Sequence, residues 1–470
     1  MKQFNLITLL VLFFLLFIFN NVEGQNKTLS LDETLNIIRK FHPVAKQADL
    51  LVSLSNASLQ SSRGAFDPAV YVSNERKTFD GKNYYSYSNP EIKIPTWFGV
   101  DLKAGVENNI GDRMEPMFSS GKSTYAGFSI PVLKNLLFDK RRAAVQQGKI
   151  MVNMSSQDRL LTINDLLYHA VDAYWSWVSA HQSYVILTNT LAINKTRFEN
   201  VKQLFIGGDR AAIDTTEALT QLQSIEAMQL QSGLNLQKQK LLLSNFLWSD
   251  SNTPYELTDD IVPDSSWNVV LVKDYPLPSL IDALSSATTM HPKLLMVGFK
   301  QDMLEVDKKS KFQGLLPTLN INYNFLNKGY SSKGFFENRL FQNNYKYGFQ
   351  FGLPLFQRQA RGEYSMAKIK LTGQQLEKKQ QRLEIENKVK YAFSELISLQ
   401  QQAVLFDQNV KNQLLLLQAE ETKFSIGESS LFLVNTRENK LLESQQKMAE
   451  LKTKFFKSII ALQWSAGQLR

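Results

Sequence analysis

A proline-free stretch over residues 133–252 limits what this chain can fold into more than any other feature. It contains only four glycines, and two of them, Gly207 and Gly208, are adjacent. Proline and glycine are the residues that most disfavour a helix, so little before this pair prevents a very long one. Apolar residues recur at spacings of three and four, as on one face of a coiled-coil helix. The pattern predicts a helix over residues 140–205, on the order of 100 Å long at about 1.5 Å per residue.

Gly207 and Gly208, followed by Asp209, predict a turn that ends this helix, because glycine accepts the left-handed backbone angles of helix C-termini. A second helix is expected to return over residues 211–247. Residues 355–470 are also free of proline and are interrupted near their middle at Gly427, which precedes Glu428. The sequence therefore predicts two antiparallel helical hairpins.

Composition and charge exclude several kinds of protein. A content of 43% hydrophobic and 21% charged residues is typical of a folded chain. The net charge is +9, but Lys and Arg are scattered, so we expect no nucleic-acid partner. The absence of cysteine excludes disulfides, thiolate metal sites and a lipid-modified cysteine.

The chain carries no pattern of residues that predicts a catalytic, cofactor or metal site. Its four histidines, His42, His169, His181 and His291, are far apart in sequence and are expected to be structural. Gly121-Lys122-Ser123 resembles the end of a phosphate loop but lacks the glycine that the motif needs before it. We therefore expect a protein that is not an enzyme and binds no cofactor.

Residues 1–24 have the composition of a secretory signal peptide. Lys2 is followed by an apolar run over residues 6–19, which is short for a membrane-spanning helix. We expect a mature chain that begins near Gln25 and is exported from the cytoplasm. An uncleaved membrane anchor is the alternative.

In the two halves of the chain, the residues that interrupt helices and strands occur in the same order. His42-Pro43 corresponds to His291-Pro292, and Pro68 and Pro131 correspond to Pro317 and Pro354. Each half is expected to contain a helix, extended segments that end at a proline, a long helix, a glycine turn and a returning helix. The predicted organisation is a first repeat over 25–252, an irregular surface linker over 253–278 and a second repeat over 279–470.

Alternating apolar and polar residues between the paired prolines predict β-strands. The second half gives strands over 316–326 and 345–355, so we expect two strands in each half. The two prolines are 63 positions apart in the first half and 37 positions apart in the second. This surplus is either a longer outer loop or an extra hairpin.

Four strands cannot close a barrel of useful size, and each unpaired backbone group in a membrane costs several kcal/mol. Three chains would supply twelve strands, an even number as in bacterial outer-membrane barrels. Three chains would also bring together twelve long helices, which can pack side by side into a hollow cylinder. The expected fold class is mainly α with a membrane β-barrel part: a trimeric twelve-strand barrel continued by a long α-helical barrel.

The ordered set of features resembles the TolC family of outer-membrane efflux and secretion channels. The residues that carry the resemblance are the strand ends followed by basic residues and the two glycine turns: Pro131-Val132-Leu133, Pro354-Leu355-Phe356, Arg141-Arg142-Ala143 and Arg361-Gly362. The resemblance implies a homotrimer in outer-membrane lipid, with its helical part in the periplasm. It also implies a periplasmic adaptor protein, an inner-membrane pump, and a passive channel for efflux or type I secretion. A soluble extracytoplasmic coiled-coil scaffold or adhesin is the alternative.

The resemblance also points to candidate site residues. Gly207, Gly208, Asp209, Gly427 and Glu428 would form the periplasmic tip turns. In the family, an aspartate six residues after the first turn glycine lines a narrow mouth, and Asp214 stands at that spacing from Gly208.

An aromatic residue of the family is matched by Phe424, so Asp214 and Phe424 are the candidate pore constriction. The second hairpin departs from the pattern, because Leu433 and Thr436 stand where some members carry aspartates. The alternative is that Asp209 caps the returning helix and Asp214 is a solvated acid in its first turn.

Overall fold

The computed structural model describes residues 27–330 and 343–470, so the predicted signal peptide lies outside the described residues. The chain divides into two compact units, and each takes segments from both halves of the sequence. The helical unit contains the described residues up to Ala48, Leu161–His291 and Ile385–Arg470. The sheet unit contains Asp49–Leu160 and the described residues of Pro292–Glu384.

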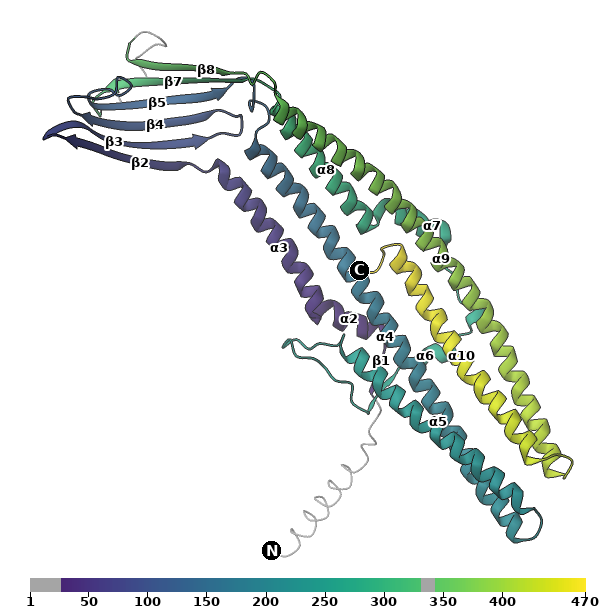
Figure 1. The fold of residues 1–470 in the computed structure, drawn as a ribbon. Coiled ribbons are helices and arrows are strands. Elements are labelled where there is room, and N and C mark those ends of the chain that lie inside the picture. The colour runs from purple at the N-terminus through teal and green to yellow at the C-terminus, as the bar shows by residue number, and fades with distance from the viewer. Residues whose placement is uncertain (1–26, 331–342) are drawn as a thin grey trace, which may run out of the picture. The chain divides into compact units, whose positions relative to one another are not determined.

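The two halves present long helices in the same order (Figure 1). The first half has α2 (Leu31–Phe41), α3 (Pro43–Arg63), α4 (Lys140–Ile206) and α5 (Ala212–Ser244). The second half has α7 (Leu280–Met290), α8 (Pro292–Gln313), α9 (Arg358–Ser425) and α10 (Leu431–Ser465). The long helix expected over 140–205 and its return expected over 211–247 are therefore present as α4 and α5. Across the described residues, no helix is both long enough and apolar enough to cross a membrane.

Local signals explain where the shorter helices begin and end. Ser30 caps α2: its hydroxyl accepts a hydrogen bond from the Glu33 backbone N–H at 3.2 Å, and the Glu33 carboxylate accepts one from the Ser30 N–H. His42 then adopts an extended backbone before Pro43, so α2 stops and α3 begins. His291 and Pro292 separate α7 from α8 in the same way.

The sheet unit is built on a six-stranded sheet in which every neighbouring pair is antiparallel. Its order is β2-β3-β4-β5-β7-β8 (Figure 1). The strands are β2 (Ala69–Phe79), β3 (Lys82–Pro95), β4 (Asp101–Ile110), β5 (Gly121–Pro131), β7 (Thr318–Lys328) and β8 (Tyr345–Gly352).

The expectation of two strands in each half is wrong for the first half, which has four. The surplus residues form the extra hairpin β3–β4, which lies between β2 and β5. Asp80 and Gly81 connect β2 to β3 as a two-residue turn, and both have positive φ angles of 52° and 71°. Asp-Gly is a strong hairpin signal because this turn requires left-handed backbone angles. The second half keeps the predicted two strands, although residues 331–342 of their connection lie outside the described residues.

A polar joint links the last strand of the first half to α4 within the sheet unit. The Asp139 carboxylate accepts a hydrogen bond from the Arg142 N–H at 2.8 Å, as an N-cap does. The Arg142 guanidinium donates to the carbonyls of Asn135 and Leu136, both at 2.7 Å. Burial favours a higher pKa for Asp139, but the hydrogen bonds and charge of Arg142 outweigh it and hold that pKa below its usual value. Arg142, singled out by the resemblance, thus fixes how the chain enters the long helix.

The helical unit has an aromatic core to which the inter-repeat linker contributes. Trp175 of α4 stacks on Phe456 of α10 with ring centroids 5.2 Å apart. Trp267, in α6 (Ser266–Val269) of the linker, packs edge-on against Trp175 at 6.0 Å and is buried. The linker strand β6 (Ile261–Pro263) pairs in parallel with β1 (Lys27–Leu29). The expectation of an irregular surface linker is therefore wrong over these residues, because Trp267 anchors the segment in the core.

Candidate functional site

The two hairpin turns, both in the helical unit, share one backbone geometry. Gly208 and Gly427 each have a φ angle of +84°, which an L-residue adopts only with strain. The residue after each glycine donates its N–H to the carbonyl five positions back: Asp209 to Leu204 and Glu428 to Lys423, both at 2.9 Å. These are Schellman motifs, which satisfy the last free carbonyls of a helix. Gly208, rather than Gly207, is the residue that the turn requires.

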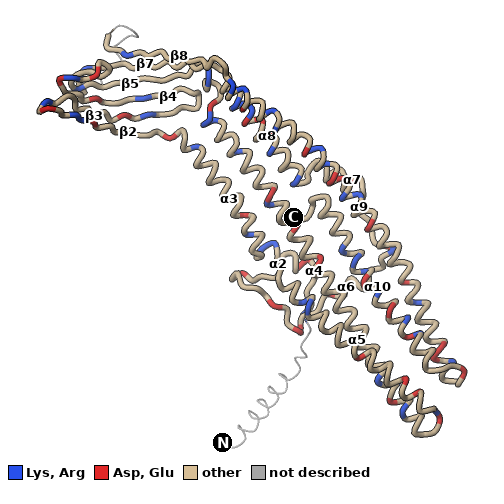
Figure 2. The backbone as a smooth tube through the Cα atoms, viewed as in Figure 1, with Lys and Arg blue, Asp and Glu red and all other residues tan. Residues whose placement is uncertain are grey.

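The predicted turn residues Asp209 and Glu428 are both exposed. The N-cap of α5 is Ala211, whose methyl side chain cannot accept a hydrogen bond, so the interpretation of Asp209 as the cap is wrong. Charged residues of both signs lie at the turns (Figure 2). Asp209 and Glu428 are thus available to contact another molecule.

Asp214 lies in the first turn of α5 and is half-buried. Burial and the negative charge of Asp214 raise the pKa of Glu217, although a hydrogen bond with Asn435 of α10 opposes this shift. The two acids are three residues apart and lie on one face of the helix. The acidic position predicted from the sequence therefore has a second carboxylate, Glu217, beside it.

Phe424, the predicted aromatic of the constriction, packs into the core of its own chain. It joins an apolar cluster containing Val201, Ala218 and Leu431, which brings together both hairpins. The guanidinium of Arg210 lies over its ring at 4.1 Å and also donates to its backbone carbonyl at 3.0 Å. The structure therefore places Phe424 where it fixes the first turn against the second.

A buried polar cluster that the sequence analysis missed joins the two hairpins. Glu438 of α10 accepts hydrogen bonds from Arg197 at 2.8 Å and from Asn194 at 3.0 Å, both on α4. Arg197 also pairs with the more exposed Glu421 of α9 at 3.3 Å. The side chains of Arg197 and Glu438 are only 14% and 6% exposed. The cluster thus sets the register of the hairpins, since a buried carboxylate needs these partners.

A sequence signal for this cluster exists in the heptad spacing. Leu187, Asn194 and Val201 follow one another at intervals of seven and are all buried. Polar residues at core positions of a coiled coil select one register at a cost in stability. Because Asn194 lies at a buried heptad position of α4, the sequence indicates that its polar side chain needs a hydrogen-bond partner.

The Glu420 carboxylate makes further polar contacts near the second turn. It accepts a hydrogen bond from the Ser429 hydroxyl at 2.5 Å and lies 3.8 Å from the Arg437 guanidinium. Ser429 lies in the turn between α9 and α10. Arg437, eight residues further along the chain, supplies a positive charge beside Glu420.

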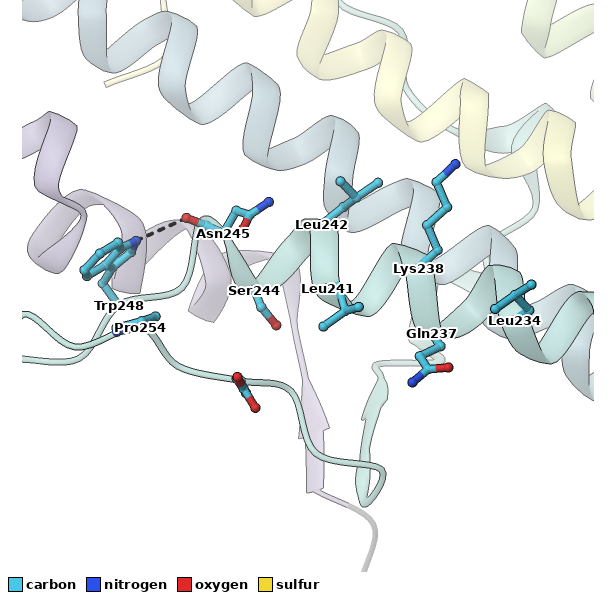
Figure 3. Close-up of a pocket in the computed structure, with 10 residues that line it drawn as sticks. Leu234, Gln237, Lys238, Leu241, Leu242, Ser244, Asn245, Trp248 and Pro254 are labelled. Atoms are coloured by element: carbon cyan, nitrogen blue, oxygen red, sulfur yellow. Dashed lines mark hydrogen bonds between the residues drawn. The ribbon is translucent and has the colours of Figure 1, made fainter.

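An open groove of about 710 Å³ follows the C-terminal part of α5 (Figure 3). Leu234 and Leu241 line it and are 61% and 59% exposed. Trp248 closes one end and donates its indole N–H to the Asn245 carbonyl at 3.1 Å (Figure 3). The lining is mainly apolar and amide, which suits contact with another protein rather than proton transfer.

Comparison with known proteins gives both a family match and a shared fold. Residues 283–468 match the model of the outer membrane efflux protein family. No curated protein sequence matches the chain.

Solved structures with the same fold include the CmeC outer membrane channel of Campylobacter jejuni. It shares 14% sequence identity with this chain and has a TM-score of 0.66. The match covers 93% of this chain and 86% of the CmeC chain. VceC from Vibrio cholerae shares 12% identity, with coverage of 93% and 96% and a TM-score of 0.63. The open state of the MtrE outer membrane channel of Neisseria gonorrhoeae shares 11% identity, with coverage of 94% and 89% and a TM-score of 0.66. The family match and the shared fold confirm the resemblance to TolC-like outer membrane efflux channels that the sequence indicated.

Proposed function

We propose that this chain is the outer-membrane channel of a tripartite efflux or type I secretion system. The observation that carries the proposal is a six-stranded sheet with one apolar face, in which five strands have 10–14 residues, in a chain that also contains two long helical hairpins. Strands of about 9–11 residues suffice to cross a bilayer when tilted. The family match over the second half adds an independent argument for export. The channel is a passive conduit, located in the outer membrane with its helices in the periplasm.

Exposed apolar residues on the long helices support a homotrimer. Ile369, Leu376 and Leu383 follow one another at heptad spacing on α9, and they are 68%, 61% and 57% exposed. A heptad seam of this kind needs a facing helix, because isolated exposed stripes favour association. The leucines that line the groove on α5 form a second seam of the same character. A neighbouring subunit is the occupant that would cover both.

The hairpin turns are the proposed contact with the periplasmic adaptor, and through it with the inner-membrane pump. Four large apolar side chains beside the turns are 64–73% exposed: Ile206, Ile213, Ile426 and Phe432. Exposed apolar residues beside charged ones are typical of protein contacts. Three copies of Asp214, each with Glu217 beside it, form the proposed acidic constriction, which would concentrate cations and disfavour anions.

Cell fractionation and gel analysis of the full chain test the proposed function. We expect the protein in the outer-membrane fraction, resistant to a salt wash, and migrating as a trimer until the sample is heated. Leu376→Glu should weaken the trimer, because it places a charge in the heptad seam. Lys370→Glu, at an exposed position of the same helix about 100° around from Ile369, is the matched control and should leave the trimer intact. A protein released by salt as a monomer would instead support the soluble scaffold.

A further inference from the structure

The extra hairpin β3–β4 lies in the middle of the sheet rather than at its margin. β3 pairs with β2 and β4 pairs with β5 along most of their lengths. β3 has 14 residues and β4 has 10, against 11 in β2 and in β5. The hairpin is therefore as long as the strands that flank it, and it reaches the length needed to cross a bilayer.

The apolar face of the sheet continues without a break across the extra hairpin. One row of paired residues contains Ile94, Leu102, Phe128, Tyr323 and Tyr347, each from a different strand. Ile94 and Leu102, from the hairpin, are 37% and 44% exposed. Residues opposite one another in an antiparallel pair point to the same face. The hairpin therefore presents to lipid the same kind of surface as the other strands.

The opposite face of the hairpin is polar and is connected to β5. The Tyr125 hydroxyl donates to the Glu91 carboxylate of β3 at 2.6 Å. Its ring lies over Gly105 of β4, where a Cβ would approach the ring to 2.7 Å. Lys93 of β3 and Asp101 of β4 form an ion pair at 3.5 Å. Because the tyrosine reaches across β4 to β3, the hairpin is held in the sheet and faces water on this side.

The register of the sheet staggers the ends of its strands. A complete row runs from Ala69, the first residue of β2, through Lys93, Lys103, Gly127 and Asn324 to Lys346 of β8. Lys346 lies six residues before Gly352, the end of β8. If the start of β2 and the end of β8 lie at the same depth in the membrane, a shift of six residues over five strand-to-strand steps corresponds to a strand tilt of roughly 40°. This tilt is the one that closed outer-membrane barrels adopt.

We propose that all six strands of each subunit enter the membrane, and that β8 of one copy pairs with β2 of the next to close an eighteen-stranded barrel. The inference rests on the proposed trimeric channel. Among the described strands of the sheet, β2 and β8 are the two edges. They run in opposite directions because five antiparallel steps separate them, so the new pair is also antiparallel. An unpaired edge in hydrocarbon costs several kcal/mol for each free backbone group, which a second copy removes.

The proposal gives a wider channel than twelve strands would. At a strand spacing of about 4.8 Å and a tilt of about 40°, eighteen strands form a ring roughly 36 Å across, against roughly 24 Å for twelve. The alternative is a twelve-stranded barrel in which β2 and β3 leave the wall, so that β4 pairs with the neighbouring β8. The two arrangements differ in which strand meets β8.

Cysteine crosslinking separates the two arrangements, and the chain has no cysteine of its own. The test variant is Ser73→Cys with Gln350→Cys, on the polar faces of β2 and β8. The matched control is Lys103→Cys with Gln350→Cys, which moves the first thiol to β4. Full-length protein in outer membranes is treated with a short bis-maleimide and analysed on a denaturing gel.

We expect covalent dimers and trimers from the Ser73 variant and monomers from the Lys103 variant. The reverse result, or an intact trimer without crosslinks in the Ser73 variant, would overturn the eighteen-stranded barrel. Loss of the trimer in the unmodified chain would instead reject the proposed function, so the two failures are distinguishable.

Discussion

Replacing Arg197 with methionine tests whether the buried polar cluster holds the two hairpins together. The change keeps most of the apolar stem and leaves Glu438, 6% exposed, without its cationic partner. Breaking a buried ion pair from one side costs about 3–5 kcal/mol, because the remaining charge stays desolvated. Asn194 still donates to Glu438 at 3.0 Å, and a hydrogen bond to a charged group contributes about 1.5–3 kcal/mol. We therefore expect a loss of about 2–3 kcal/mol in local stability.

Amide hydrogen exchange of α10 in the detergent-extracted protein measures this loss directly. A cost of about 2–3 kcal/mol corresponds to exchange about 30- to 160-fold faster over residues 431–445. Lys411→Met is the control: its ion pair with Asp407, at 2.7 Å, is 69% and 45% exposed, and should contribute less than about 0.5 kcal/mol.

A double variant, Arg197→Met with Glu438→Leu, completes the test. It removes both charges, so the free energy of local opening obtained from hydrogen exchange should return to within about 1 kcal/mol of that of the unmodified protein. Exchange in Arg197→Met that is no faster than in Lys411→Met, or a double variant less stable than the single one, would show that the polar cluster does not hold the hairpins together.

Three further changes test the turns, the constriction and a buried histidine. Gly208→Ala should destabilise its turn by about 1–2 kcal/mol, because φ is +84°, whereas Gly207→Ala should have little effect; local hydrogen exchange compares them. Asp214→Ala should alter single-channel conductance and weaken block by divalent cations, with Glu428→Ala as the comparison; unchanged conductance and block would exclude the acidic ring. Burial lowers the pKa of His42 below its usual value of about 6.5, because the folded state favours the neutral imidazole. The stability that His42 contributes is therefore full above about pH 6.5 and is lost as the pH falls and the imidazole becomes protonated. The protection of α2 from amide hydrogen exchange should therefore fall when the pH is lowered from 7 to 5. The His42→Gln variant should show a smaller fall.

The long helices were predictable because their signals are local and repeated. An apolar stripe at spacings of three and four recurs many times along α4, and a glycine pair ends it. The capping box at Ser30 and the break at His42-Pro43 also depend only on neighbouring residues. Each of these features fixes backbone angles or hydrogen bonds within about one helical turn.

The strand count was harder to predict because a strand is defined by its partners. The first part of β3 carries polar residues on both faces, such as Asn83 and Ser86, so alternation there is weak. Asp80-Gly81 was the available signal, since it specifies a two-residue turn without reference to the rest of the sheet. Without that signal, the same residues are equally consistent with a long polar loop.

The structure has turns where the sequence predicts them, but the contacts of the residues around these turns were not predictable. The spacing from Gly208 located Asp214, and the fold brings Glu217 beside it. The pairing of Arg197 with Glu438 joins residues 241 positions apart, and no sequence period relates them. A charged residue at a core position shows only that a partner exists, and the partner is found only once two helices are aligned.

The width of the proposed barrel also fits the helices of the sheet unit. The chain places parts of α3, α4, α8 and α9 in that unit, so the proposed trimer would contain twelve such helices. Helices packed 8–10 Å apart would form a ring roughly 31–39 Å across. Eighteen strands at the observed stagger give roughly 36 Å, whereas twelve give roughly 24 Å. With β3–β4 between β2 and β5, the proposed strand barrel reaches the diameter of the helix ring without a steeper tilt of its strands. The extra hairpin therefore fits in the wall of the proposed channel.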